Sequence, residues 1–107
     1  MRCVVIGSGA FGFAIAVNLL KNGNDVTVWC SSKDKLNEIK SGKEIIPGIK
    51  TPIEMKFTDS IKDAVIDADV IYLMTSAKYI GDVTKKINKY AKKDAVYCIG
   101  SKGIEQG

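Results

Sequence analysis

The sequence predicts an α/β domain with a doubly wound parallel sheet, in which five strands in the order 3-2-1-4-5 lie between two layers of helices. Apolar runs of strand length alternate with helical patterns along the whole chain, as is typical of parallel strands joined by crossover helices. A glycine-rich hexapeptide follows the first of these runs. The length of 107 residues suits one domain, so we expect residues 1–107 to form a single unit.

Residues 1–30 contain three expected elements. Cys3–Ile6 is an apolar run that predicts the first strand, and Asp25–Trp29 shows the alternation of a second strand. Residues 11–22 have helical spacing between them, with Ile15 and Leu19 expected on the buried face. Gly23 should end this helix, because glycine readily adopts the left-handed conformation that follows many helices.

Residues 31–99 continue the same alternation. We expect Ser31 or Ser32 to cap a helix that runs to Lys40, followed by a loop over residues 42–54 that holds both prolines. The further expected elements are a strand at Met55–Thr58, a short helix from Asp59 or Ser60 to Ile66, a strand at Val70–Met74, a helix at Tyr79–Ala91 and a strand at Ala95–Ile99. The fourth strand is almost wholly apolar, so we expect it to be central and buried on both faces.

Composition excludes several classes of function. The chain has no histidine, so Ser-His catalysis, Cys-His catalysis and histidine-ligated metal sites cannot be built from it alone. No run approaches the roughly 18 apolar residues of a membrane helix, and no signal peptide is recognisable, so we expect a cytoplasmic protein. The three cysteines lack Cys-x-x-Cys spacing and are expected to be buried, reduced thiols.

The net charge is +4, and lysines gather near the end of one expected helix. These lysines are Lys85, Lys86, Lys89, Lys92 and Lys93. A solvated basic surface accounts for them, because cations suit a helix C-terminus. The alternative is attraction for an anion, either nucleic acid or a phosphorylated small molecule. The chain shows no nucleic-acid recognition motif, so we expect no nucleic-acid partner.

The glycine-rich hexapeptide predicts a dinucleotide site. It reads G-x-G-x-x-G and consists of Gly7, Ser8, Gly9, Ala10, Phe11 and Gly12. The pattern alone is weak, but here it follows an expected strand and opens an expected helix, which is the context of a Rossmann-type fingerprint. Gly7 would permit the tight turn, Gly9 would let a pyrophosphate approach the backbone, and Gly12 would allow close helix–sheet packing. The helix N-terminus would then hold the phosphates of NAD or NADP.

The end of the second strand leaves the choice of cofactor open. An acidic residue there normally binds the ribose of NAD, but Trp29 is followed by Cys30-Ser31-Ser32-Lys33, with no carboxylate before Asp34. The two serines and the lysine either contact the 2′-phosphate of NADP or simply begin a helix.

Two further candidates follow from sheet geometry, because ligands bind at the carboxyl ends of parallel strands. Tyr79 follows the fourth strand and either lies against the cofactor or packs in the core. Lys102 follows the fifth strand, within Gly100–Gly103, and is either a substrate ligand or a solvated loop lysine.

Taken together, these motifs resemble NAD(P)-dependent glycerol-3-phosphate dehydrogenase. The matching segments are the glycine turn at residues 7–14, Asn22–Trp29, the Pro-Gly loop at residues 46–52, Thr58-Asp59, Ala68–Ile71 and the Lys-Gly-Ile-Glu segment at residues 102–105. Their order and spacing cover nearly the whole chain, and the Pro-Gly loop and the Lys102 segment distinguish it from hydroxyacid and ketopantoate dehydrogenases.

The resemblance implies reversible reduction of dihydroxyacetone phosphate to sn-glycerol 3-phosphate with NAD(P)H, which supplies glycerophospholipid synthesis. It implies that Ala10 and Phe11 line the cofactor, that Ser31 faces the adenosine ribose or its phosphate, and that Tyr79 borders the cofactor cleft. Lys102 would reach the substrate. The family also has a C-terminal helical domain that carries the catalytic base, and we expect the complete enzyme to be a homodimer.

The chain departs from the family pattern at three points. Ser76 stands where the family usually has proline, and Ser31 stands where it often has arginine or histidine. The chain is also much shorter than family members, so we interpret it as the N-terminal cofactor-binding portion. The alternatives are a stand-alone dinucleotide-binding or redox-sensing module, and the cofactor domain of a related hydroxyacid or ketopantoate-type dehydrogenase.

Overall fold

The computed structural model describes residues 1–7, 9–30, 32–45, 48–74 and 77–99. The elements in this part of the chain are β1 (Arg2–Ile6), α1 (Ala10–Lys21), β2 (Asp25–Trp29), α2 (Lys33–Lys40), β3 (Lys56–Thr58), α3 (Ile61–Val65), β4 (Val70–Leu73), α4 (Ala77–Tyr90) and β5 (Val96–Ile99). Every expected element is present, and its ends lie within two residues of the predicted positions.

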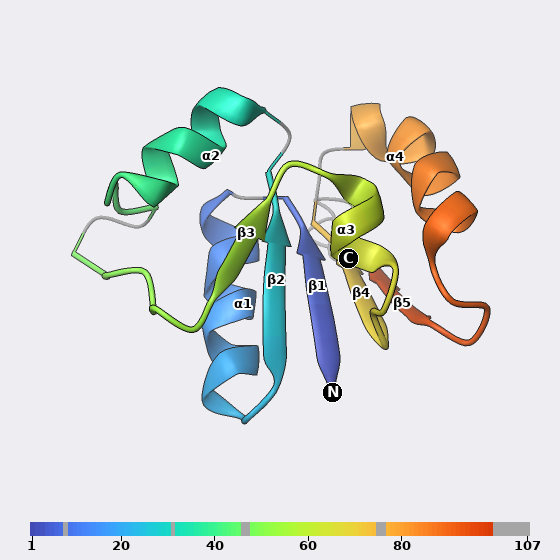
Figure 1. Cartoon of the computed structure of the whole chain (residues 1–107), viewed down its shortest axis with the longest axis horizontal. Helices are drawn as coiled ribbons and strands as arrows, with labels where there is room; N and C mark the ends of the chain where they lie inside the picture. The colour runs from blue at the N-terminus through green and yellow to red at the C-terminus, as the bar shows by residue number, and fades with distance from the viewer. Residues whose placement is uncertain (8, 31, 46–47, 75–76, 100–107) are drawn as a thin grey trace.

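The strands form one parallel sheet in the order β3-β2-β1-β4-β5, which confirms the predicted fold class. The chain moves outward from β1 through β2 to β3, then crosses back over β1 to β4 and continues to β5 (Figure 1). β4 lies between β1 and β5, as its apolar sequence predicts, and three of its four residues are buried.

The sheet separates two apolar cores. On one face, Val5 and Val28 pack with Phe13 and Ala16 of α1. The other face holds alternate residues of the same strands, together with buried side chains of α3 and α4. The second core consists of Val4, Ile6, Ile61, Ala64, Val65, Ala68, Ile71, Leu73, Val83 and Ile87. Helices therefore cover both faces of the sheet, which gives the predicted three layers (Figure 1).

The buried face of α1 differs from the expected one. Phe13 and Ala16 are fully buried, whereas Ile15 and Leu19 are only half-buried. The first turn of α1 approaches β1 closely at Gly12, so Phe13 lies against the sheet. The buried face of the helix is therefore rotated toward Phe13 and Ala16 and away from Ile15 and Leu19. Gly23 follows the helix with a φ of 87°, as the sequence predicts.

The cysteines are free thiols. Cys3 and Cys30 are buried and Cys98 is half-buried. Cys3 pairs with Val26 near the start of β2, while Cys30 follows the last residue of β2, so the two thiols are held apart along the sheet. Among the helices described, none is both long and apolar enough to cross a membrane.

Candidate nucleotide site at the carboxyl edge of the sheet

All five strands end at one row across the sheet. Ile6 pairs with Trp29 on one side and with Leu73 on the other, Trp29 pairs with Thr58, and Leu73 pairs with Ile99. These residues are the last of their strands, so the segments that follow them leave from a single edge. The direction of strand progression reverses at β1, and ligands of open parallel sheets bind beside such a reversal.

Gly7 makes the turn out of β1. Its φ of 128° lies in a region that side chains disfavour, so glycine is required here. Its backbone N–H donates to the carbonyl of Trp29 at 3.1 Å, which extends the β1–β2 pairing one residue beyond the strand. The turn is therefore held firmly at the edge of the sheet.

Gly12 brings α1 close to the turn. A Cβ atom at this position would lie 2.7 Å from the carbonyl oxygen of Gly7 and 3.3 Å from a methyl carbon of Val5. Only a residue without a side chain fits between the helix and the strand in this arrangement. The third glycine of the motif thus serves packing, as its position predicts.

Gly9 lies in a different environment. It is the N-cap of α1, with φ −73° and ψ 174°, and its carbonyl accepts from Phe13 N–H at 2.9 Å. A Cβ atom at Gly9 would meet nothing within 4 Å, so the space beside it is open. The protein fold does not require glycine here, and this residue type fits a ligand that approaches the backbone.

The N-terminus of α1 suits an anion. No side chain caps it, and the first turn carries no acidic residue. A helix N-terminus leaves backbone N–H groups without intrahelical partners and concentrates about half a positive charge there. Open space at Gly9 and unblocked N–H groups together form an arrangement that can bind a pyrophosphate.

The end of β2 is anchored to the end of β3. The indole Nε1–H of Trp29 donates to the carbonyl of Asp59 at 3.0 Å, and Cys30 N–H donates to the carbonyl of Thr58 at 2.8 Å. Ser32 caps α2, because its hydroxyl accepts from Lys35 N–H at 3.2 Å. The capping interpretation is confirmed for Ser32, while Ser31 lies outside the described residues.

A hollow of about 210 Å³ opens beside Gly9. Its lining residues are Gly9, Lys35, Glu38, Ile39, Lys43, Glu44 and Ile45. The sequence did not single out Lys35 or Lys43, because nothing in the spacing of the loop at residues 42–54 shows that it folds back against α2. A larger hollow of about 500 Å³ shares Ile39 and Glu44 but reaches no glycine of the turn.

The remaining predicted site residues divide into three groups. Phe11 projects from the first turn of α1 with 61% of its surface exposed, which is unusual for a large apolar side chain. Ala10 and Tyr79 lie in α1 and α4, but their side chains are not described. Ser8, Ser31 and Lys102 fall outside the described residues. In the described part of the chain, no group of three or more Cys, Asp or Glu residues could hold a metal ion.

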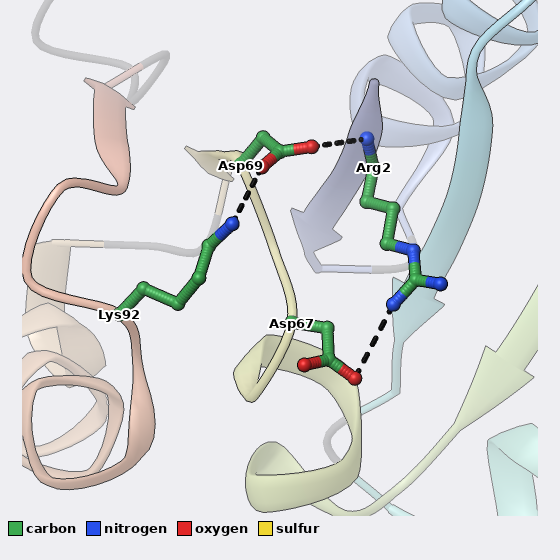
Figure 2. Close-up of polar contacts among 4 residues, drawn as sticks. All are labelled: Arg2, Asp67, Asp69 and Lys92. Atoms are coloured by element: carbon green, nitrogen blue, oxygen red, sulfur yellow. Dashed lines mark hydrogen bonds and ion pairs between the residues drawn. The ribbon is translucent and has the colours of Figure 1, made fainter.

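The amino end of the sheet carries a contrasting polar cluster, drawn in Figure 2. The Asp69 carboxylate accepts from the backbone N–H of Arg2 at 2.9 Å and from the Lys92 ammonium at 2.6 Å (Figure 2). Both contacts hold the pKa of Asp69 below its usual range, and the hydrogen bond from the Arg2 backbone has the larger effect. The contact with Asp69 raises the pKa of Lys92. Burial raises the pKa of the Cys3 thiol and of the Tyr72 hydroxyl nearby.

Comparison with known proteins identifies relatives over nearly the whole chain. Residues 2–107 match the family model described as the N-terminus of NAD-dependent glycerol-3-phosphate dehydrogenase. A glycerol-3-phosphate dehydrogenase [NAD(P)+] of Bacillus subtilis is 36% identical over 97% of this chain. The chain spans only 31% of the length of that relative.

Solved structures show the same fold. Glycerol-3-phosphate dehydrogenase from Coxiella burnetii superimposes with a TM-score of 0.87 at 18% identity, over 94% of this chain and 32% of its own. A ketopantoate reductase from Ralstonia eutropha superimposes with a TM-score of 0.75 at 13% identity, over 91% of this chain and 33% of its own. At these identities the superpositions establish the fold, which is shared by dehydrogenases of different substrates.

Proposed function

Because the chain belongs to the NAD-dependent glycerol-3-phosphate dehydrogenase family, whose N-terminal region it matches, we propose that it is the NAD(P)(H)-binding portion of such an enzyme. The reaction would be the reversible reduction of dihydroxyacetone phosphate to sn-glycerol 3-phosphate, a precursor of glycerophospholipids. The observation that carries this proposal is that the three glycines of the turn have different roles. Gly7 and Gly12 are required by the fold, whereas Gly9 leaves open space beside the backbone.

The residues of the turn fit the cofactor. The backbone N–H groups at the start of α1 would bind the pyrophosphate, and Gly9 would allow it close to the backbone. The adenosine half would extend toward the end of β2, where Ser31 follows Cys30. The other half would extend toward β4, where Tyr79 and the exposed ring of Phe11 would border it.

NAD(P)H, when bound, would supply the hydride, and the chain would orient the substrate beside it. In the sequence, Lys102 comes three residues after the last residue of β5, and we propose that its ammonium binds the phosphorylated ketone or its carbonyl oxygen as charge develops. Reduction of a ketone also needs a proton donor and a site closed to water. We propose that a C-terminal helical domain supplies both, and that the complete enzyme is a cytoplasmic homodimer.

The test is an assay of the complete enzyme for oxidation of NADH and NADPH that depends on dihydroxyacetone phosphate. Lys102→Ala in that enzyme should lower kcat/KM severely, because truncating one member of a buried charge pair costs on the order of 2–5 kcal/mol. Affinity for NAD(P)H should stay close to that of the unaltered enzyme.

Residues 1–107 alone should bind cofactor without turnover. Wild-type kcat/KM in the Lys102→Ala enzyme would remove the role proposed for this residue. Absence of any activity with dihydroxyacetone phosphate in the complete, unaltered enzyme would overturn the proposed reaction itself.

A further inference from the structure

Among the described residues, the hollow beside Gly9 contains one lysine, Lys35, that forms no ion pair with the carboxylates beside it. Its charged lining residues are Lys35, Lys43, Glu38 and Glu44. Lys43 Nζ lies 3.4 Å from Glu38 Oε1, and Glu44 Oε1 accepts from Gly48 N–H at 3.0 Å. Across the residues that the structure describes, no carboxylate forms an ion pair with Lys35. A ligand can therefore engage the Lys35 ammonium without breaking an ion pair of the described residues.

The position of Lys35 relates this charge to the cofactor. α2 begins four residues after the end of β2, and the ribose of the adenosine half of a dinucleotide lies at that strand end in this type of sheet. The hollow also reaches Gly9, which would meet the pyrophosphate. A group attached to this ribose on the side of α2 would lie in the hollow, between the end of β2 and Gly9.

We propose that Lys35 binds the 2′-phosphate of NADP(H) in this hollow and thereby sets the cofactor choice of the chain. This inference rests on the proposed function. It explains how the chain can accept a 2′-phosphate without an arginine directly after β2, because Lys35 supplies the cation from the first turn of α2. The ion pair of Lys43 with Glu38 has a second effect, because it partly neutralises the carboxylate that would otherwise repel the phosphate.

The experiment compares NADPH and NADH binding by calorimetry for the unaltered chain and for Lys35→Gln. Lys35→Gln should weaken NADPH binding about tenfold, the scale of one charge-assisted hydrogen bond, and leave NADH binding nearly unchanged. Lys40→Gln is the matched control, because Lys40 is an exposed lysine of the same helix that does not line this hollow. Lys43→Gln should also weaken NADPH binding selectively, but by less than Lys35→Gln does, because it leaves the Glu38 carboxylate without its ion-pair partner.

The results separate this inference from the function on which it rests. Equal losses for NADPH and NADH in Lys35→Gln would indicate a structural role and overturn the inference. The inference would also be overturned if Lys33→Gln weakened NADPH binding selectively and Lys35→Gln did not, because the 2′-phosphate would then lie at the first residue of α2. If the unaltered chain binds neither dinucleotide, the proposed function fails and the inference falls with it.

Discussion

The two ends of the sheet use polar groups in opposite ways. At the amino end, Asp69 is engaged by the Arg2 backbone and by Lys92, and its side chain is 38% exposed. At the carboxyl end, the glycine turn presents backbone N–H groups and the open space beside Gly9. One end therefore joins β1, β4 and the segment after α4 to each other, while the other end leaves its donors available to a ligand.

This difference shows why a perturbed pKa is an incomplete guide to a functional site. Shifted pKa values cluster at active sites in many enzymes, but Asp69 and Lys92 owe their shifts to contacts within the fold. Phosphate binding at the carboxyl end would rely on backbone amides, which do not titrate. In this chain, the features that indicate the site are the open space beside Gly9 and the absence of acidic residues from the first turn of α1.

The largest expected effect separates packing from binding within the glycine turn itself. Gly12→Ala places a Cβ atom 2.7 Å from the Gly7 carbonyl oxygen, so α1 or the turn must shift. We expect a loss of about 1–3 kcal/mol in the free energy of unfolding, the usual range for overpacking, together with weaker dinucleotide binding. Thermal and denaturant unfolding measure the first effect, and calorimetry measures the second.

Gly81→Ala is the control for that change. Gly81 lies in α4, where a Cβ atom meets nothing within 4 Å, so alanine should raise stability by up to about 1 kcal/mol through its higher helix propensity. Destabilisation of the same size in both variants would show that the close approach of Gly12 to Gly7 has no special importance.

A smaller effect is expected at the amino end. Asp69→Asn removes the carboxylate that Arg2 and Lys92 share, so the melting temperature at neutral pH should fall by less than in Gly12→Ala, with dinucleotide affinity unchanged. Asp67→Asn is the control, because Asp67 and Arg2 form an exposed ion pair and such pairs contribute little. A loss of dinucleotide affinity in Asp69→Asn would contradict the separation of the two ends.

The pH dependence of this variant has a defined sign. The pKa of Asp69 is lowered in the folded state, so its stabilisation is present above the unfolded value of 3.8 and is lost as pH falls below it. The difference in melting temperature between the unaltered chain and Asp69→Asn should therefore shrink in acid. A difference that stays constant down to the folded-state pKa would show that the charge of Asp69 is not what stabilises this end.

The order of the elements and the glycine turn could be predicted from sequence because both depend on local patterns. Alternating apolar runs predict the strands, and the spacing of Gly7, Gly9 and Gly12 predicts a different role for each. Lys35 and Lys43 could not be predicted as neighbours of Gly9, since the hollow depends on how a loop of irregular sequence folds against α2. The burial of Phe13 escaped prediction for a related reason, because it follows from the tight contact at Gly12.

We propose above all that the carboxyl edge is a dinucleotide site, in which Gly9 serves the ligand and not the fold. Gly9→Val tests it most directly: the residue has an ordinary φ of −73° and nothing within 4 Å of a Cβ atom, so valine should cost the fold about 1 kcal/mol, the scale of an unfavourable N-cap residue. The branched side chain would instead occupy the space that the pyrophosphate needs.

The measurement is calorimetry of NADH and NADPH with the Gly9→Val chain, beside its melting temperature. We expect only a small fall in melting temperature, from the changed N-cap of α1, and loss of detectable binding of both cofactors. Binding of either cofactor with unchanged affinity would contradict it, because the pyrophosphate could not then lie against Gly9.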